Sequence, residues 1–75
     1  MEKNKRVREI IKKLGGASKI AQKLGLQRMS VYFWLWDGVP IKYWRWIISE
    51  GVATWEDLGR SKVEALEAKE RDRSL

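Results

Sequence analysis

The chain contains no cysteine and no histidine, and each absence removes a class of chemistry. Without cysteine there is no disulfide framework, no thiolate metal site and no cysteine nucleophile. Without histidine, the commonest general base and metal ligand is also missing. These absences exclude most hydrolase and metalloenzyme mechanisms. We therefore expect no catalytic residues, no metal, no cofactor and no small-molecule ligand.

Long apolar runs are absent as well, and proline occurs only once. No segment approaches the roughly 20 apolar residues that a membrane-spanning helix needs. The first eight residues are polar and lack the apolar region of a secretory signal peptide. The sequence thus predicts a cytoplasmic protein with no membrane partner.

Aromatic residues and positive charge are abundant. The 75 residues include five tryptophans, two tyrosines and one phenylalanine, and 44% are hydrophobic. This composition argues against global disorder and suits one small domain. Residues 1–48 hold eleven Lys or Arg and three acids, a net charge of +8, whereas residues 49–75 carry −2. A basic segment followed by an acidic one suggests an anionic partner for the first part.

Apolar spacing and glycine positions predict a compact all-α bundle of five short helices. In the first helix, apolar residues recur at the i, i+3, i+4, i+7 positions that form one helical face. Glycines punctuate the predicted helix ends, and Pro40 is suited to the first position of the fourth helix. The expected helices cover about residues 5–14, 17–24, 27–36, 40–49 and 62–69.

Two capping signals occur in the last third of the chain. Thr54 can cap a short helical turn that Gly59 would end, with Leu58 docking back onto the core. Ser61 and Glu64 have the spacing of a capping box and predict the start of the last helix. We therefore expect one domain over residues 1–60, followed by a charged, partly disordered helix or tail over residues 61–75.

The middle of the chain has the spacing of a helix-turn-helix. Such a pair crosses at a steep angle, about 90–120°, so a small residue, Ala21, is needed at the crossing. The turn between the helices requires a positive φ angle, which Gly25 supplies. Leu26, Val31 and Trp34 can then fill the space between the two helices.

The stretch GGASKIAQKLGLQRMSVYFWLWDGVP resembles the lambda-type Cro/CI repressor superfamily, and within it the small phage-type Cro proteins. The resemblance extends over roughly residues 7–58. Tyr32 and Phe33 depart from it, because the family usually has small polar or amide residues there. The matching residues are Gly15, Gly16, Ile20, Ala21, Leu24, Gly25, Leu26, Val31, Trp34, Leu35, Gly38, Val39 and Pro40.

The resemblance implies a lambda-repressor-like bundle whose residues 1–60 bind double-stranded DNA. It implies a bacterial or phage-encoded repressor associated with the nucleoid, which occludes a promoter by placing the helix at about residues 27–36 in the major groove. A homodimer, at least on DNA, would read a palindromic operator.

The expected DNA contacts fall into two groups. Base contacts are expected from the exposed side of the third helix, namely Gln27, Arg28, Tyr32 and Phe33. Phosphate contacts are expected around it, from Ser18, Lys19, Ser30, Lys42, Tyr43 and Arg45.

The remaining tryptophans leave alternatives open. Trp36, Trp46 and Trp55 cannot all be buried in so small a domain. Trp46 and Tyr43, with Trp55 as a further member, are candidates for a homodimer seam, or they cap the core under the C-terminal segment.

The alternative function is a protein-interaction module of the same fold, either an adaptor or an antitoxin-like partner. A ring of basic side chains around the third helix would favour DNA. A single dry patch formed by Tyr32, Phe33 and Trp36 would favour a protein partner.

Overall fold

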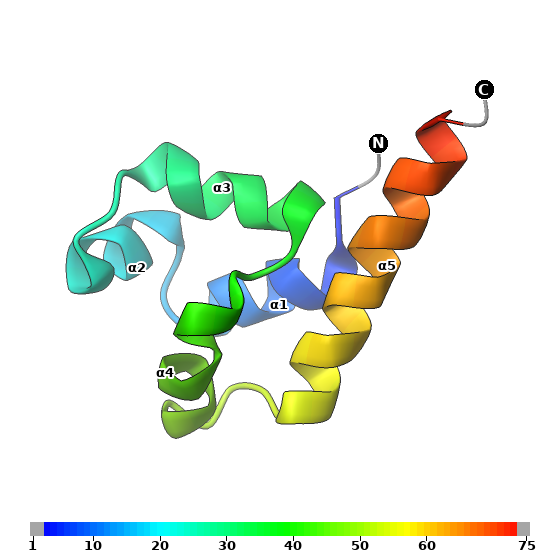
Figure 1. Ribbon diagram of the computed structural model, residues 1–75. Helices are drawn as coiled ribbons and strands as arrows, with labels where there is room; N and C mark the ends of the chain where they lie inside the picture. The colour runs from blue at the N-terminus through cyan, green and yellow to red at the C-terminus, as the bar shows by residue number, and fades with distance from the viewer. Residues whose placement is uncertain (1–2, 74–75) are drawn as a thin grey trace.

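The computed structural model describes residues 3–73 (Figure 1). These residues form five α-helices and one short 3-10 helix. No strand occurs within these residues, so the all-α prediction is confirmed. The first three helices match their predicted bounds to within one residue. The elements are α1 (Lys5–Lys13), α2 (Ala17–Leu24), α3 (Arg28–Asp37), η1 (Ile41–Tyr43), α4 (Trp44–Ser49) and α5 (Trp55–Arg73).

One core joins all five helices. Each α-helix contributes a side chain with 0% exposure, and these are Val7, Ile20, Val31, Ile47 and Leu58 in chain order. Burial of one such side chain stabilises the fold by about 1.5–3 kcal/mol. The helices are short, so this shared burial, rather than helix propensity, holds them in place.

The connection between α2 and α3 is short and close-packed. Ala21 is 5% exposed, and its carbonyl accepts a hydrogen bond of 2.8 Å from the backbone N–H of Leu26. Gly25 ends α2 with a φ angle of +69°, which glycine adopts without steric cost. The predicted roles of Ala21 as a small packing residue and Gly25 as a turn residue are thus confirmed.

The fourth helix begins differently from the prediction. Pro40 has an extended ψ of 137°, and its carbonyl accepts a bond from the Tyr43 N–H, so a 3-10 turn precedes α4. Ile41, although apolar, is 66% exposed, whereas Val39 is 1% exposed. The indole Nε1 of Trp44 donates to the Val39 carbonyl at 2.8 Å. This bond satisfies the indole N–H, and the Trp44 ring is partly buried against the core.

The two helical segments expected after residue 54 form one continuous helix, α5, so two predictions about helix ends are wrong. Gly59 does not end a helix, and it is not among the glycines with a positive φ. Ser61 is not a cap: it is fully buried within the helix, where its hydroxyl donates to the Leu58 carbonyl at 2.7 Å. Burial of Leu58 and Ala65 on the same side offsets the roughly 1 kcal/mol that an interior glycine costs.

The N-terminus of α5 confirms the predicted cap at Thr54. The Thr54 hydroxyl accepts from the Asp57 N–H, and the Asp57 carboxylate accepts from the Thr54 N–H, both at 3.1 Å. The backbone bond from Thr54, and then the Thr54 side chain, lower the pKa of the Asp57 carboxyl from its usual value. Because this folded-state pKa is lowered, the associated stability is present at neutral pH and is lost as the pH falls through the folded-state pKa.

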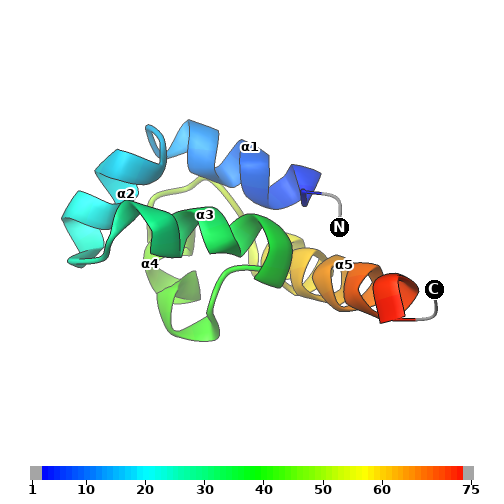
Figure 2. The ribbon, with the colours of Figure 1, turned by 90° about the horizontal axis from the view of Figure 1, so that it is seen from above.

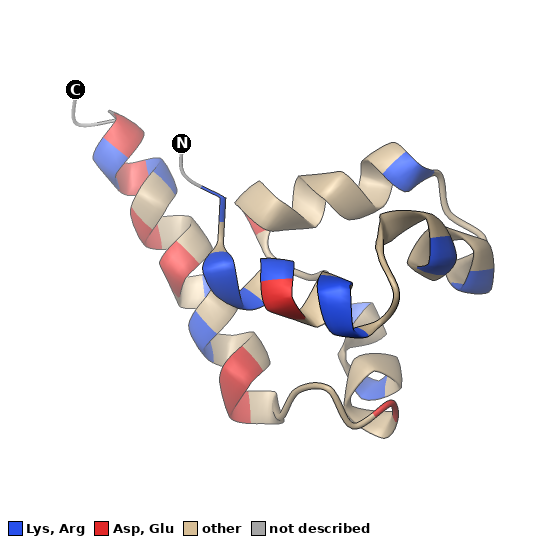
Figure 3. Cartoon of the chain, turned by 180° about the vertical axis from the view of Figure 1, so that it is seen from behind, with Lys and Arg blue, Asp and Glu red and all other residues tan. Residues whose placement is uncertain are grey.

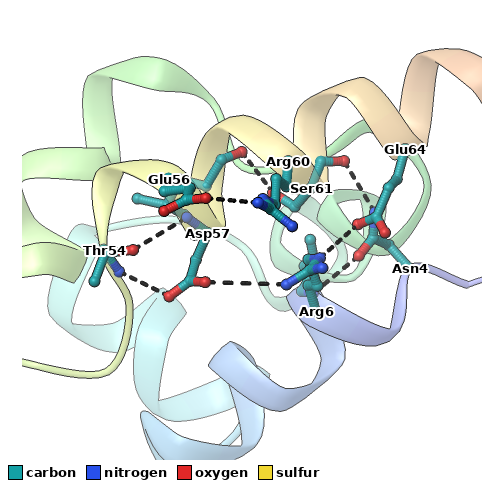
Figure 4. A network of polar contacts seen from close by, with 10 residues as sticks. Asn4, Arg6, Thr54, Glu56, Asp57, Arg60, Ser61 and Glu64 are labelled. Atoms are coloured by element: carbon teal, nitrogen blue, oxygen red, sulfur yellow. Dashed lines mark hydrogen bonds and ion pairs between the residues drawn. The ribbon is translucent and has the colours of Figure 1, made fainter.

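A polar network joins the N-terminus of α1 to α5 (Figure 4). Asn4 caps α1 by accepting from the Val7 N–H at 3.2 Å, and its Nδ2 donates to the Ser61 carbonyl at 2.9 Å. Arg6 Nε lies 3.0 Å from a Glu64 carboxylate oxygen, as an ion pair without hydrogen-bond geometry. The N-terminal end of α1 is thus held against the middle of α5.

We expect Asn4→Ala to lower the free energy of unfolding by about 1–3 kcal/mol, because it removes a helix cap and a second hydrogen bond together. Asn4→Ser keeps an N-cap oxygen but cannot reach Ser61, so its loss should be smaller. Urea denaturation followed by circular dichroism measures both variants. Equal losses in the two variants would contradict a capping contribution from Asn4.

Candidate nucleic-acid interface

Helix α3 lies at the surface with one side against the core. Val31, Trp34 and Leu35 are buried, between 0% and 6% exposed. Seen from above, α3 lies between α1 and the η1–α4 segment, with α2 at its N-terminal end (Figure 2). The opposite side of α3 is uncovered along its length, so its outward side chains can reach a partner.

The four residues expected to contact bases all lie exposed on α3 or at its start. Gln27 precedes the first turn, and Arg28 is its first residue. Tyr32 is 40% exposed and Phe33 is 54% exposed. Neither ring is buried against a neighbouring helix of the described chain.

Met29 belongs to the same surface, although the sequence reasoning did not select it. It is 56% exposed. At about 100° per residue, Met29 and Phe33 lie about 160° from Val31 in opposite directions around the helix. The burial of Val31 therefore places this pair at the centre of the outward face, and that spacing was the signal in the sequence.

Most of the expected phosphate contacts surround α3 as exposed side chains. Ser18 and Lys19 lie in the first turn of α2, while Ser30 is exposed on α3 itself. Lys42 is exposed on η1 and Arg45 on α4.

Tyr43 differs from the other phosphate candidates because it is half-buried. Its ring centroid lies 5.6 Å from that of Trp34 on α3. The Lys42 ammonium lies 5.2 Å from the centre of the Tyr43 ring. Tyr43 therefore links η1 to α3 and supports the Lys42 side chain.

The charges are segregated around this surface. The sequence has no Asp or Glu from residue 10 to residue 36, or from residue 38 to residue 49. Acidic residues occur mainly on α5, as seen from behind (Figure 3). Within residues 3–73, no carboxylate lies within ion-pair distance of the five cations that α2, α3, η1 and α4 carry, namely Lys19, Lys23, Arg28, Lys42 and Arg45.

Two carboxylates, one on α5 and one at the end of α3, form ion pairs with basic residues of α5. Glu56 pairs with Arg60 at 2.6 Å within α5, and Asp37 at the end of α3 pairs with Lys69 at 2.6 Å. The Asp37 carbonyl also accepts a bond from Lys62. The one acid on α3 therefore lies at its C-terminus and is neutralised by α5, which leaves the rest of α3 beside unpaired positive charge.

A groove of about 360 Å³ runs between α1 and α3. Tyr32 lines one wall, and Arg8 and Lys12 of α1 line the other. Both basic residues are exposed. The cationic surroundings of α3 therefore extend onto α1.

The three unassigned tryptophans differ in burial. Trp36 and Trp46 are partly buried against the core, and Lys3 lies 5.9 Å from the Trp36 ring centre. Trp55 is 56% exposed, with its ring 6.1 Å from that of Trp44. Of the proposed seam residues, only Trp55 thus presents most of its surface to solvent.

Comparison of the chain with protein-family models, curated proteins and solved structures gives no significant match. None of the helices in the described range has the length and apolar character that a membrane crossing requires. Residues 3–73 likewise hold no group of three acidic side chains placed to bind a metal ion.

Proposed function

We propose that the chain binds double-stranded DNA sequence-specifically and regulates transcription, most simply as a repressor that occludes a promoter. The observation that carries this proposal is the uncovered face of α3, near cations that no carboxylate among residues 3–73 neutralises. Such a field attracts a polyanion and supplies the sequence-independent part of DNA affinity.

In this proposal, α2 and α3 act as a helix-turn-helix. The N-terminal end of α3 enters the major groove while α2 crosses the sugar–phosphate backbone. Arg28 can donate in bidentate fashion to guanine O6 and N7, and Gln27 can pair with adenine N6 and N7. Lys19 of α2 and Lys42 of η1 would contact phosphates.

The proposal includes two copies on a palindromic site. One small module of this kind buries only about 600–1,000 Å² of protein surface on DNA. Two-fold pairing doubles the contacts and sets the spacing of the half-sites at one helical turn of DNA or a multiple of it.

Selection of bound duplexes from a random pool tests the proposal directly. We expect a palindromic consensus with a guanine in each half-site that depends on Arg28. Arg28→Ala should relax the preference at that base pair, with a loss of about 1–3 kcal/mol of discrimination per half-site.

Arg60→Ala is the matched control, because it removes the same charge from the exposed outer side of α5. It should leave the consensus unchanged. An unchanged consensus for Arg28→Ala would contradict the role of that side chain, whereas failure of the folded wild-type chain to bind any duplex at low salt would overturn the proposal.

A protein-interaction module remains the second candidate, because Met29 and Phe33 present an apolar surface on the same face. Adaptors and antitoxin-like proteins use such surfaces to hold a partner. This reading predicts that neutral substitutions of Lys19 and Arg45 leave partner binding intact, whereas the DNA proposal predicts a large loss of affinity.

A further inference from the structure

The centre of the outward face of α3 is apolar. Met29 and Phe33 lie one turn apart and are 56% and 54% exposed. Phenylalanine has no hydrogen-bonding group, and the methionine thioether is only a weak acceptor. These two side chains therefore offer almost no hydrogen bonds to base edges, unlike the neighbouring hydroxyls of Ser30 and Tyr32.

Each of the two side chains presents more than half of its surface to solvent. The Phe33 ring makes no aromatic contact within residues 3–73, and neither residue packs against the core.

Resting on the proposed DNA binding, we propose that Met29 and Phe33 are specificity-determining residues that read thymine through its C5-methyl group. This methyl is the apolar group among the features that distinguish base pairs in the major groove. Packing of a side chain on it removes apolar surface of both partners from water. Sites that lack the methyl offer polar edges, which these two residues cannot satisfy.

The helix geometry limits where these thymines lie. Arg28 and Phe33 are five residues apart, which is about 7.5 Å along the helix axis. That distance corresponds to about two base-pair steps of 3.4 Å. The contacted thymines are therefore expected within about two base pairs of the guanine read by Arg28.

Deoxyuridine replacement tests the inference, because it removes only the methyl group and keeps base pairing. Each thymine of the selected duplex is replaced in turn, and the Kd is measured by fluorescence anisotropy. We expect one or two positions per half-site at which the wild-type chain binds about fourfold more weakly, the fold-change that corresponds to about 0.8 kcal/mol for one buried methyl-sized group.

Variants assign the effect to particular side chains. Phe33→Ala and Met29→Ala should each bind thymine and uracil equally at one of the sensitive positions. Leu66→Ala is the control, because Leu66 is 53% exposed but lies on α5 and not on α3. This variant should retain the fourfold difference.

Three results would overturn the inference while DNA binding stands: no sensitivity to uracil at any position, sensitivity that persists in both α3 variants, or a selected site without thymine near the guanine. Absence of duplex binding by the folded wild-type chain would overturn the proposed function together with the inference.

Discussion

Truncation of Trp34 to alanine is expected to lower the free energy of unfolding by about 3–5 kcal/mol, the range for a large aromatic removed from a core. Trp34 is 3% exposed, and its ring packs against that of Tyr43 on η1. Proteins have free energies of unfolding of about 5–15 kcal/mol, so this variant would lose a large part of its stability. Urea denaturation followed by far-ultraviolet circular dichroism measures it.

Trp55→Ala is the matched control, because its side chain is 56% exposed. It loses mainly the tilted ring contact with Trp44, a loss of about 0.5–1.5 kcal/mol. Equal destabilisation by the two variants would contradict the view that α3 is held through Trp34. Under the DNA proposal, Trp34→Ala should also abolish binding at temperatures where the chain unfolds.

The structure of the α2–α3 region was predictable because local steric requirements determine its residues. Gly25 supplies a positive φ angle at the end of α2, and Ala21 provides a small side chain where the helices meet. Val31 and Trp34, three residues apart, define the buried side of α3. These requirements involve neighbours within about a dozen residues, so a single sequence is sufficient to detect them.

The course of α5 was not predictable in the same way. Gly59 and Ser61 have turn and cap preferences, but tertiary contacts decide their conformation. Ser61 is buried against α1, where its carbonyl accepts from Asn4, 57 residues earlier in the chain. No local pattern reveals such a partner, and the capping-box spacing of Ser61 and Glu64 therefore misled the prediction.

The outward face of α3 was predicted only in part. Gln27, Arg28, Tyr32 and Phe33 are exposed as expected, whereas Met29 was omitted. Methionine usually fills cores, and residue type therefore outweighed its position opposite Val31. The resemblance did not predict which base contacts this face makes. At Tyr32 and Phe33 the chain has aromatic residues, where the family has polar ones.

The acidic C-terminal segment also acquires a structural role. Arg6 of α1 lies near Asp57 and Glu64 of α5, and Asp37 is paired with Lys69. The carboxylates are thereby engaged on the α5 side of the bundle. Within residues 3–73, the cations of α2, η1 and α4 have no carboxylate partner, which is the charge asymmetry that the DNA proposal requires.

That asymmetry predicts a steep dependence of DNA affinity on salt. If Lys19, Lys42 and Arg45 of each of two copies neutralise one phosphate each, the slope of log K against log salt is about −5. Raising the salt from about 50 to 200 mM should then weaken binding about 10³-fold. Anisotropy titrations of a fixed palindromic duplex across this range measure the slope.

Neutral substitutions show which cations are responsible. Lys42→Gln should weaken binding to all duplexes about equally and reduce the slope by about one per copy, because phosphate contacts carry no sequence information. Arg60→Gln makes the same change in net charge next to Glu56 on α5, and it should leave the slope unchanged. If the two variants reduce the slope equally, only the net charge matters and the cations around α3 are not phosphate contacts. Affinity that is independent of salt would contradict any DNA complex held by these side chains.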